Sequence, residues 1–127
     1  MKFSSVCIIT RDVSKLRDFY TMVLGVEAEG DDRFTILLAE RPALTLFSEQ
    51  GMEQMAPGCM AGAGCGRVVL EVEVADVDQE YERLKALNVS IVKPPTTQLW
   101  GIRSVWIHDP DGNIINLNAR VVLTNEA

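Results

Sequence analysis

The sequence predicts an α+β protein of two similar modules, each with the order strand, helix and three strands. A strand pattern followed by a helix with one apolar face occurs once in each half of the chain. Each helix begins near an aspartate, Asp12 or Asp76, and ends before a residue that accepts the left-handed conformation, Gly25 or Asn88. A hairpin pattern closes the second half. An internal repeat of this kind indicates two modules packed together.

The first half is predicted to contain a strand, a helix and two further strands, over residues 6–10, 16–24, 34–39 and 43–47. Apolar residues of the helix recur at intervals of three and four residues, which places them on one face. Asp12 and Ser14 are both candidates for the N-cap. Only a short link separates the last two strands, which suits a hairpin.

The second half repeats this order with a strand over 68–74. Asp76 can cap the next helix, with Gln79 at the capping-box spacing. A short strand over 89–92 is expected to end at Pro94 and Pro95, because proline lacks the amide hydrogen that strand pairing needs.

The stretch from Trp100 to Leu117 reads as two strands joined by a tight turn. Pro110 supplies the fixed φ of an early turn position, and Gly112 can take the positive φ that closes the turn. A three-residue loop then sets Asp109 opposite Asn113. This register predicts three facing pairs on one side of the hairpin: His108 with Ile114, Trp106 with Asn116, and Ser104 with Asn118.

At 127 residues the chain fits a single domain, with modules over about 1–48 and 67–120. Residues 48–66 join them and are rich in glycine and methionine with little periodicity. We expect a linker there. It is either a solvent-exposed connector or a mobile loop whose methionines line a binding surface.

The formal charge of −6 and pI near 4.7 argue against nucleic acid as a partner, because a phosphate backbone needs a basic face. The charge suits a cationic small molecule, or it simply keeps the protein dispersed. No apolar run has membrane-spanning length and no export signal is apparent, so no membrane association and a cytoplasmic location are expected. Three cysteines without zinc-site spacing fit free thiols in a reducing compartment.

Three segments carry a resemblance to a known family: Asp12 to Gly25, residues 74–84, and Trp100 to Asn113. Together they resemble the vicinal oxygen chelate superfamily, which includes glyoxalase I, bleomycin-resistance proteins, fosfomycin-resistance enzymes and extradiol dioxygenases. The resemblance implies paired βαβββ modules that form a curved mixed sheet around a cavity, usually in a homodimer.

Metal-dependent members of that family hold an ion with one ligand from each of four strands. By position, the corresponding residues of this chain are Ser5, Thr45, Val69 and Asn116. A divalent ion needs imidazole or carboxylate ligands, whereas hydroxyls and an amide bind weakly and valine does not bind. We therefore expect no metal, no other cofactor and no catalytic residue.

The resemblance also implies which residues face the cavity, once strand alternation is applied. The predicted ligand-binding residues are Ser5, Cys7, Thr45, Phe47, Val69, Glu71, Trp100, Arg103, Trp106, His108, Asn116 and Asn118. Such a lining suits a planar or amphipathic organic ligand, stacked on an indole and hydrogen-bonded by amides.

Four of these residues have alternative roles that the sequence leaves open. Trp106 is either a core residue or a platform for the ligand. Glu71 either meets a ligand cation or pairs with Arg67 or Arg103. His108 is either a proton-transfer group or a hydrogen-bonding neighbour of the turn. Arg103 either grips a ligand carboxylate or caps the cavity.

The expected function is metal-free binding of a cationic or aromatic organic compound, as in the bleomycin-resistance branch and its role in antibiotic resistance. The stretch Trp100-Gly101-Ile102-Arg103 resembles that branch. An alternative is a metal-dependent lyase, isomerase or dioxygenase with unusual ligands such as Glu71, Glu73 and His108. A dimer without any small-molecule ligand is a third possibility.

Overall fold

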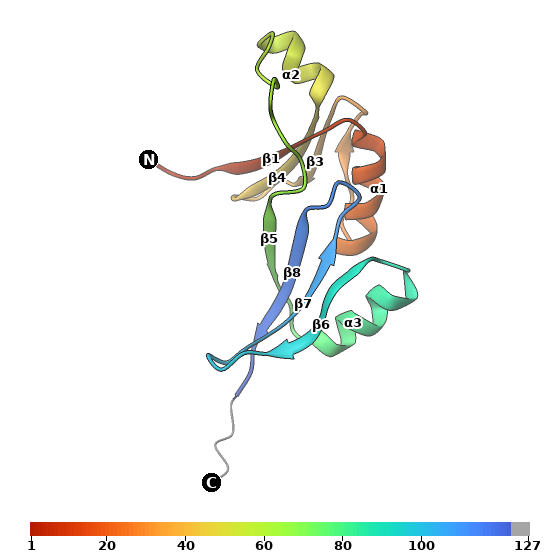
Figure 1. Ribbon diagram of the computed structural model, residues 1–127, viewed down its shortest axis with the longest axis vertical. Coiled ribbons are helices and arrows are strands. Elements are labelled where there is room, and N and C mark those ends of the chain that lie inside the picture. The colour runs from red at the N-terminus through yellow and green to blue at the C-terminus, as the bar shows by residue number, and fades with distance from the viewer. Residues whose placement is uncertain (123–127) are drawn as a thin grey trace. The chain divides into compact units, whose positions relative to one another are not determined.

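The structure of the protein is a computed structural model in which residues 1–122 are described. The chain divides into two compact units, residues 1–65 and 66–127. Each unit contains one four-stranded mixed sheet, and a long helix packs against that sheet (Figure 1). Within the described part, no helix is long and apolar enough to cross a membrane.

The first unit has the strand order β1-β4-β3-β2. Its elements are β1 (Ser5–Thr10), α1 (Val13–Leu24), β2 (Glu29–Gly30), β3 (Phe34–Leu38), β4 (Ala43–Ser48) and α2 (Glu49–Met55). β1 runs parallel to β4, and the other neighbours are antiparallel.

Helix α1 has the ends that the sequence predicts. The Asp12 carboxylate accepts a hydrogen bond from the Lys15 amide at 3.0 Å, which satisfies one of the free donors of the first turn. Gly25 closes the helix with φ +66°, and its amide donates to the Thr21 carbonyl. Leu16 and Tyr20 are fully buried on the face of α1 that packs on β3 and β4.

The second unit repeats the arrangement, with strand order β5-β8-β7-β6. Its elements are β5 (Val69–Glu73), α3 (Val77–Ala86), β6 (Ile91–Thr97), β7 (Ile102–His108) and β8 (Ile114–Arg120). β5 runs parallel to β8, as β1 does to β4. The expectation of an α+β fold with two βαβββ modules is confirmed.

One face of the second sheet is packed and the other is open. Helix α3 contacts β6, β7 and β8, and its own residue Leu84 is fully buried. On the strands, Val105, Ile107 and Ile115 have no exposed surface. Since alternate residues of a strand point to opposite faces, their neighbours form the open face.

The hairpin between β7 and β8 has the predicted register. His108 pairs with Ile114, Trp106 with Asn116, and Ser104 with Asn118. The turn is held by a hydrogen bond from the Asp109 amide to the Asn113 carbonyl at 2.8 Å. Gly112 takes φ +88°, as the turn requires.

Two expectations about the elements are wrong. Pro94 and Pro95 do not end the strand, because β6 continues to Thr97. β6 lies at the edge of the sheet, and its register shifts between Lys93 and Thr96, so the missing amides are tolerated. The segment 48–66 is also not wholly irregular, since it begins with helix α2.

Candidate functional site

The open face of the second sheet carries polar and aromatic residues in two rows that cross the strands. In the first row, Glu71 on β5 pairs with Asn116 on β8, which pairs with Trp106 on β7, which pairs with Lys93 on β6. This row passes from a carboxylate through an amide and an indole to an ammonium group.

The second row lies one pleat further along the strands. Glu73 pairs with Asn118, Asn118 with Ser104, and Ser104 with Thr96. Both rows therefore begin with a carboxylate on β5, at the edge of the sheet opposite to β6.

The two rows form most of a pocket of about 450 Å³, a size that suits a small organic molecule. Its lining residues are Glu71, Glu73, Gln98, Trp100, Ile102, Ser104, Trp106, Asn116 and Asn118. All of them belong to the second unit.

Trp106 is the centre of the lining and is half-buried. The Lys93 ammonium nitrogen lies over its ring, 5.2 Å from the ring centroid, in a cation–π contact. The indole Nε1–H is shielded from water and has no hydrogen-bond partner among residues 1–122. A shielded donor without a partner costs free energy that an incoming acceptor can recover.

The two amides between Trp106 and the carboxylates make a local contact of their own. The Asn118 side-chain nitrogen donates to the backbone carbonyl of Asn116 at 3.3 Å and lies 3.4 Å from the Asn116 Oδ1 atom. These long contacts fix the relative position of the amides. They leave hydrogen-bonding capacity for a ligand, because each amide has further donor and acceptor positions.

Glu71 and Glu73 are exposed, and neither forms an ion pair within the described part of the chain. The expected alternative partners of Glu71 do not pair with it. Arg103 pairs with Asp78 instead, and Arg67 forms no ion pair with a described residue. Both carboxylates are therefore available to a cation that enters the pocket.

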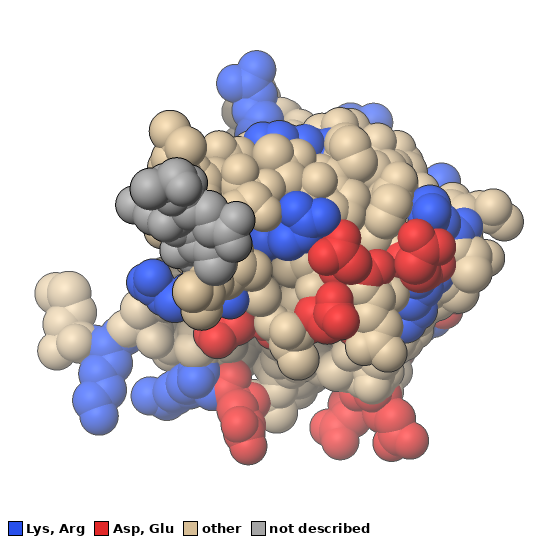
Figure 2. Space-filling view, turned by 90° about the horizontal axis from the view of Figure 1, so that it is seen from below, with Lys and Arg blue, Asp and Glu red and all other residues tan. Residues whose placement is uncertain are grey.

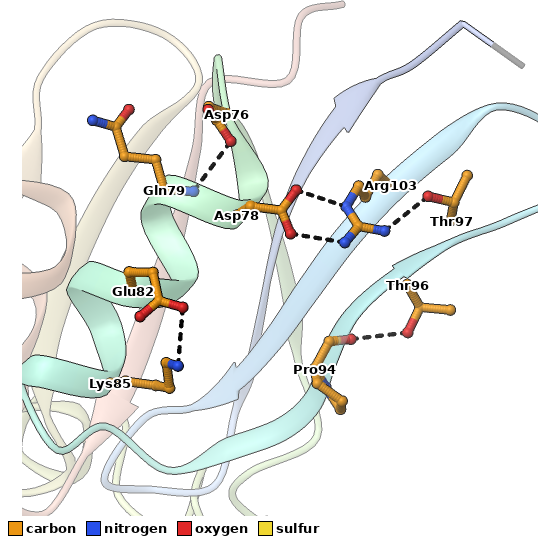
Figure 3. Close-up of polar contacts among 9 residues, drawn as sticks. All are labelled: Asp76, Asp78, Gln79, Glu82, Lys85, Pro94, Thr96, Thr97 and Arg103. Atoms are coloured by element: carbon orange, nitrogen blue, oxygen red, sulfur yellow. Dashed lines mark hydrogen bonds and ion pairs between the residues drawn. The ribbon is translucent and has the colours of Figure 1, made fainter.

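Arg103 points to the opposite face of the sheet, where it joins three elements (Figure 3). Its Nε and Nη2 atoms donate to the two carboxylate oxygens of Asp78 on α3 at 3.0 and 2.7 Å. Its Nη1 atom donates to the Thr97 hydroxyl on β6 at 2.9 Å. The Arg103 hydrogen bonds hold the pKa of Asp78 below its ordinary value, and Asp78 raises the pKa of Arg103. Arg103 thus lies outside the pocket, and we leave it out of the proposed site.

Two other expected residues belong to the open face without lining the pocket. Val69 is 53% exposed near the start of β5, two residues before Glu71. His108 is half-buried two residues beyond Trp106 and pairs with Ile114. Neither residue is among those that surround the cavity.

The remaining expected residues lie in the first unit, on strands β1 and β4 of its own sheet. Cys7 pairs with Thr45 across β1 and β4, Ser5 lies two residues earlier in β1, and Phe47 two residues later in β4. The Phe47 ring packs edge-on against the Phe34 ring, with 6.1 Å between the two ring centroids.

Four pocket residues are absent from the predicted set: Glu73, Gln98, Ile102 and Ser104. Strand alternation places Glu73 beside Glu71 and Ile102 beside Trp106. The predicted hairpin register already sets Ser104 opposite Asn118 on the Trp106 side, although Ser104 is not in the predicted ligand-binding set. Gln98 follows β6 in the bend before β7, and no sequence signal indicates that it faces the pocket.

The residues at the four family metal positions do not suit a metal ion. Val69 offers no donor atom, and Ser5 and Thr45 offer only neutral hydroxyls. Asn116 offers only a neutral amide, whose oxygen lies 3.4 Å from the Asn118 nitrogen. Among the described residues, no group of three or more His, Cys, Asp or Glu side chains is arranged to hold an ion. The alternative ligand set of Glu71, Glu73 and His108 is therefore not arranged to hold one either.

Figure 2 shows acidic and basic side chains interspersed on the viewed face. Any preference for a cation in the pocket must therefore come from the nearby carboxylates, because more distant exposed charges are screened.

Comparisons with known proteins agree with this architecture. A sequence profile described as "Glyoxalase/Bleomycin resistance protein/Dioxygenase superfamily" matches residues 2–117. The uncharacterized protein YraH of Bacillus subtilis (strain 168) is 24% identical over 124 residues, which are 92% of this chain and 97% of YraH.

Solved structures show the same fold. A glyoxalase/bleomycin resistance protein/dioxygenase from Nocardioides has a TM-score of 0.79 at 22% identity and covers 100% of this chain and 88% of its own. TioX from Micromonospora sp. ML1 has a TM-score of 0.75 at 21% identity, covering 95% and 100%. Lactoylglutathione lyase from Agrobacterium tumefaciens has a TM-score of 0.74 at 21% identity, covering 92% of each chain.

The profile match spans both βαβββ modules, and the relatives cover nearly the whole chain. The chain therefore belongs to the Glyoxalase/Bleomycin resistance protein/Dioxygenase superfamily.

Proposed function

We propose that this protein binds a small aromatic cation without a metal and sequesters it, as an antibiotic-binding protein would. The pocket of the second unit is the proposed binding site. The observation that carries the proposal is the pair of exposed, unpaired carboxylates, Glu71 and Glu73, at one end of a pocket lined by two indoles. Carboxylates attract organic cations, and an exposed indole such as that of Trp100 can stack on the aromatic part of the ligand.

The rest of the lining supports binding more than catalysis. Asn116 and Asn118 offer hydrogen bonds, and Trp100 is 70% exposed, so it is accessible to an entering ring. Proton transfer needs a positioned acid or base. His108 lies outside the lining, and among residues 1–122 no titratable group forms an ion pair with a carboxylate of the lining and so positions it.

The metal-dependent alternative is supported less well, because its ligands would have to come from a donor set that suits a metal poorly. It predicts a stoichiometric divalent ion in protein purified without a histidine tag. Metal analysis of that material therefore separates the two functions.

We further propose a homodimer, since family members commonly form one, and a cytoplasmic location. Cys7, Cys59 and Cys65 are free and exposed, which fits a reducing compartment. Sedimentation at micromolar protein tests the dimer.

A titration with ethidium, a planar aromatic cation, tests the proposed function. Anilinonaphthalene sulfonate, an aromatic anion, serves as the opposite probe. We expect ethidium to bind at micromolar concentration with quenching of tryptophan fluorescence, and to bind at least tenfold more tightly than the anion. Binding should weaken as salt is added, because exposed charges are screened. Equal affinity for the two probes, or no binding of either, would contradict the proposal.

A pair of double variants locates the binding site. Glu71→Gln with Glu73→Gln should raise the Kd of ethidium about tenfold, since exposed charge pairs each contribute a few-fold in affinity. Glu80→Gln with Glu82→Gln removes the same charge from helix α3 and should leave the Kd within about twofold. An equal loss in both variants would show that only the net charge matters.

A further inference from the structure

We infer that the preferred ligand is a zwitterion: a molecule with an ammonium group at one end and a carboxylate at the other, about 10 Å apart. This inference rests on the proposed binding function and adds the second pole of the ligand. It follows from what lies opposite to the two glutamates across the sheet.

The first row of residues has opposite charges at its ends. Glu71 on β5 is a carboxylate without a cation, and Lys93 on β6 is an ammonium group that forms no ion pair within residues 1–122. Lys93 is not one of the lining residues, but its ammonium nitrogen lies 5.2 Å from the ring centroid of Trp106, which is one of them. These two strands are the two edges of the sheet. A ligand cation is drawn to the β5 edge and repelled from the β6 edge, so it enters in one orientation.

Trp106 adds a directional donor near the positive end. Lys93 already lies over the indole ring, so the group that Trp106 still has to offer is its unpartnered Nε1–H. Because this N–H is shielded, an oxygen reaches it only after a neighbouring side chain moves. The long, flexible Lys93 side chain lies over the ring and can follow a ligand carboxylate as it moves. An ammonium group and an N–H donor together favour a carboxylate over a neutral carbonyl.

The sheet sets the distance between the two poles. β5 and β7 are separated by one strand, β8, and neighbouring strands lie about 4.8 Å apart, so Glu71 and Trp106 lie on strands roughly 10 Å apart. Asn116 lies between them in the same row and can hydrogen-bond the middle of the ligand.

Three matched probes test the inference by calorimetric titration. Each is a phenylbutylamine, with a carboxylate, a carboxamide or a methyl group at the para position of the ring. The amine and ring are common to all three, and only the pole near Lys93 changes. We expect the carboxylate to bind about tenfold more tightly than the methyl compound and the carboxamide to lie between them, since charged hydrogen bonds contribute more than neutral ones.

Two variants assign the second pole to its residues. Lys93→Met removes the charge and keeps an unbranched, flexible side chain that is one atom shorter. We expect it to reduce the affinity of the carboxylate probe to that of the carboxamide. Trp106→Phe removes the N–H and keeps an aromatic ring. It should weaken the two oxygen-bearing probes several-fold relative to the methyl probe. The ratio between probes is the readout, so a general effect of the variant on folding cancels.

The outcomes distinguish failure of the inference from failure of the proposed function. Equal affinity for the three probes, or the weakest affinity for the carboxylate, would overturn the zwitterion inference while leaving a cation-binding site intact. Binding of none of the three at millimolar concentration would overturn both. A carboxylate preference that survives in both variants would show that another part of the chain provides the second pole, which also overturns the inference as stated.

Discussion

Asp78 and Arg103 join helix α3 to strand β7 through two charge-assisted hydrogen bonds of 3.0 and 2.7 Å. Such a planar two-point contact fixes the geometry of both side chains. Arg103 also reaches Thr97 on the edge strand β6. The contact therefore links helix α3 and strands β6 and β7 (Figure 3).

Substitution of Asp78→Asn should lower the melting temperature at neutral pH by no more than a few degrees, because the Asp78 side chain is 60% exposed and water screens its charge. Arg103 lowers the pKa of Asp78 below 3.8, so the folded state binds this proton less readily than the unfolded state. The stabilisation that the Asp78–Arg103 pair gives the folded state is present above pH 3.8, and it is lost as the pH falls through the lowered pKa of Asp78. Thermal unfolding of both proteins at pH 7 and near pH 2 measures this. A difference between variant and parent that stays constant with pH would contradict the assignment.

Substitution of Asp109→Ala should destabilise the protein by about 2–4 kcal/mol, because it leaves buried donors without an acceptor. The Asp109 carboxylate, in a residue only 4% exposed, accepts from the amides of Asp111 and Asn113 and from the Asn113 side chain at 2.8–2.9 Å. Urea unfolding measures the change. Asp111→Ala is the control, since only the backbone of Asp111 takes part, and an equal loss there would argue against the network.

Gly66 and Gly62 form a matched pair for testing a close backbone approach. Their φ angles are +71° and +74°, so alanine is strained at both positions, by about 1–2 kcal/mol. A Cβ atom at Gly66 would lie 2.6 Å from the Asp111 carbonyl oxygen, whereas at Gly62 it would meet no atom within 4 Å. Gly66→Ala should therefore cost about 1–3 kcal/mol more than Gly62→Ala in urea unfolding. Equal costs would mean that Gly66 does not approach the turn of the hairpin.

The hairpin register could be predicted because its determinants are local. Pro110 and Gly112 allow few turn geometries, and the turn then sets each facing pair up to Ser104 and Asn118. The same holds for helices α1 and α3, whose caps Asp12 and Asp76 accept from amides three residues ahead.

Helix α2 could not be predicted because its third residue, Gly51, is a glycine, which ordinarily weakens a helix. The reason for the glycine is tertiary. A Cβ atom at Gly51 would lie 2.6 Å from the Phe47 ring, so only glycine lets the helix pack there. Ser48 compensates by capping the helix, with its hydroxyl accepting from the Gly51 amide at 2.9 Å.

The sequence indicates which face of the second sheet carries the candidate site, but it does not indicate every residue that lines the pocket. Alternation groups Glu71, Trp106 and Asn116 on one face, and all three line the pocket. Arg103 lies on the other face by the same rule, and its partner Asp78 is 25 residues away in the chain. Pairing at that separation depends on how α3 packs on the sheet, which periodicity does not reveal.

Chelation should leave ligand binding and stability unchanged. The four positions where relatives hold an ion carry two hydroxyls, an amide and a valine, and weak neutral donors do not displace the water shell of a divalent ion. We expect untagged protein treated with EDTA to bind ethidium with an unchanged Kd. Its melting temperature should also stay the same when zinc, nickel or ferrous iron is added at stoichiometric concentration. A rise of several degrees with one of these ions, reversed by EDTA, would instead support the metal-dependent alternative, because an ion that binds the folded state must stabilise it.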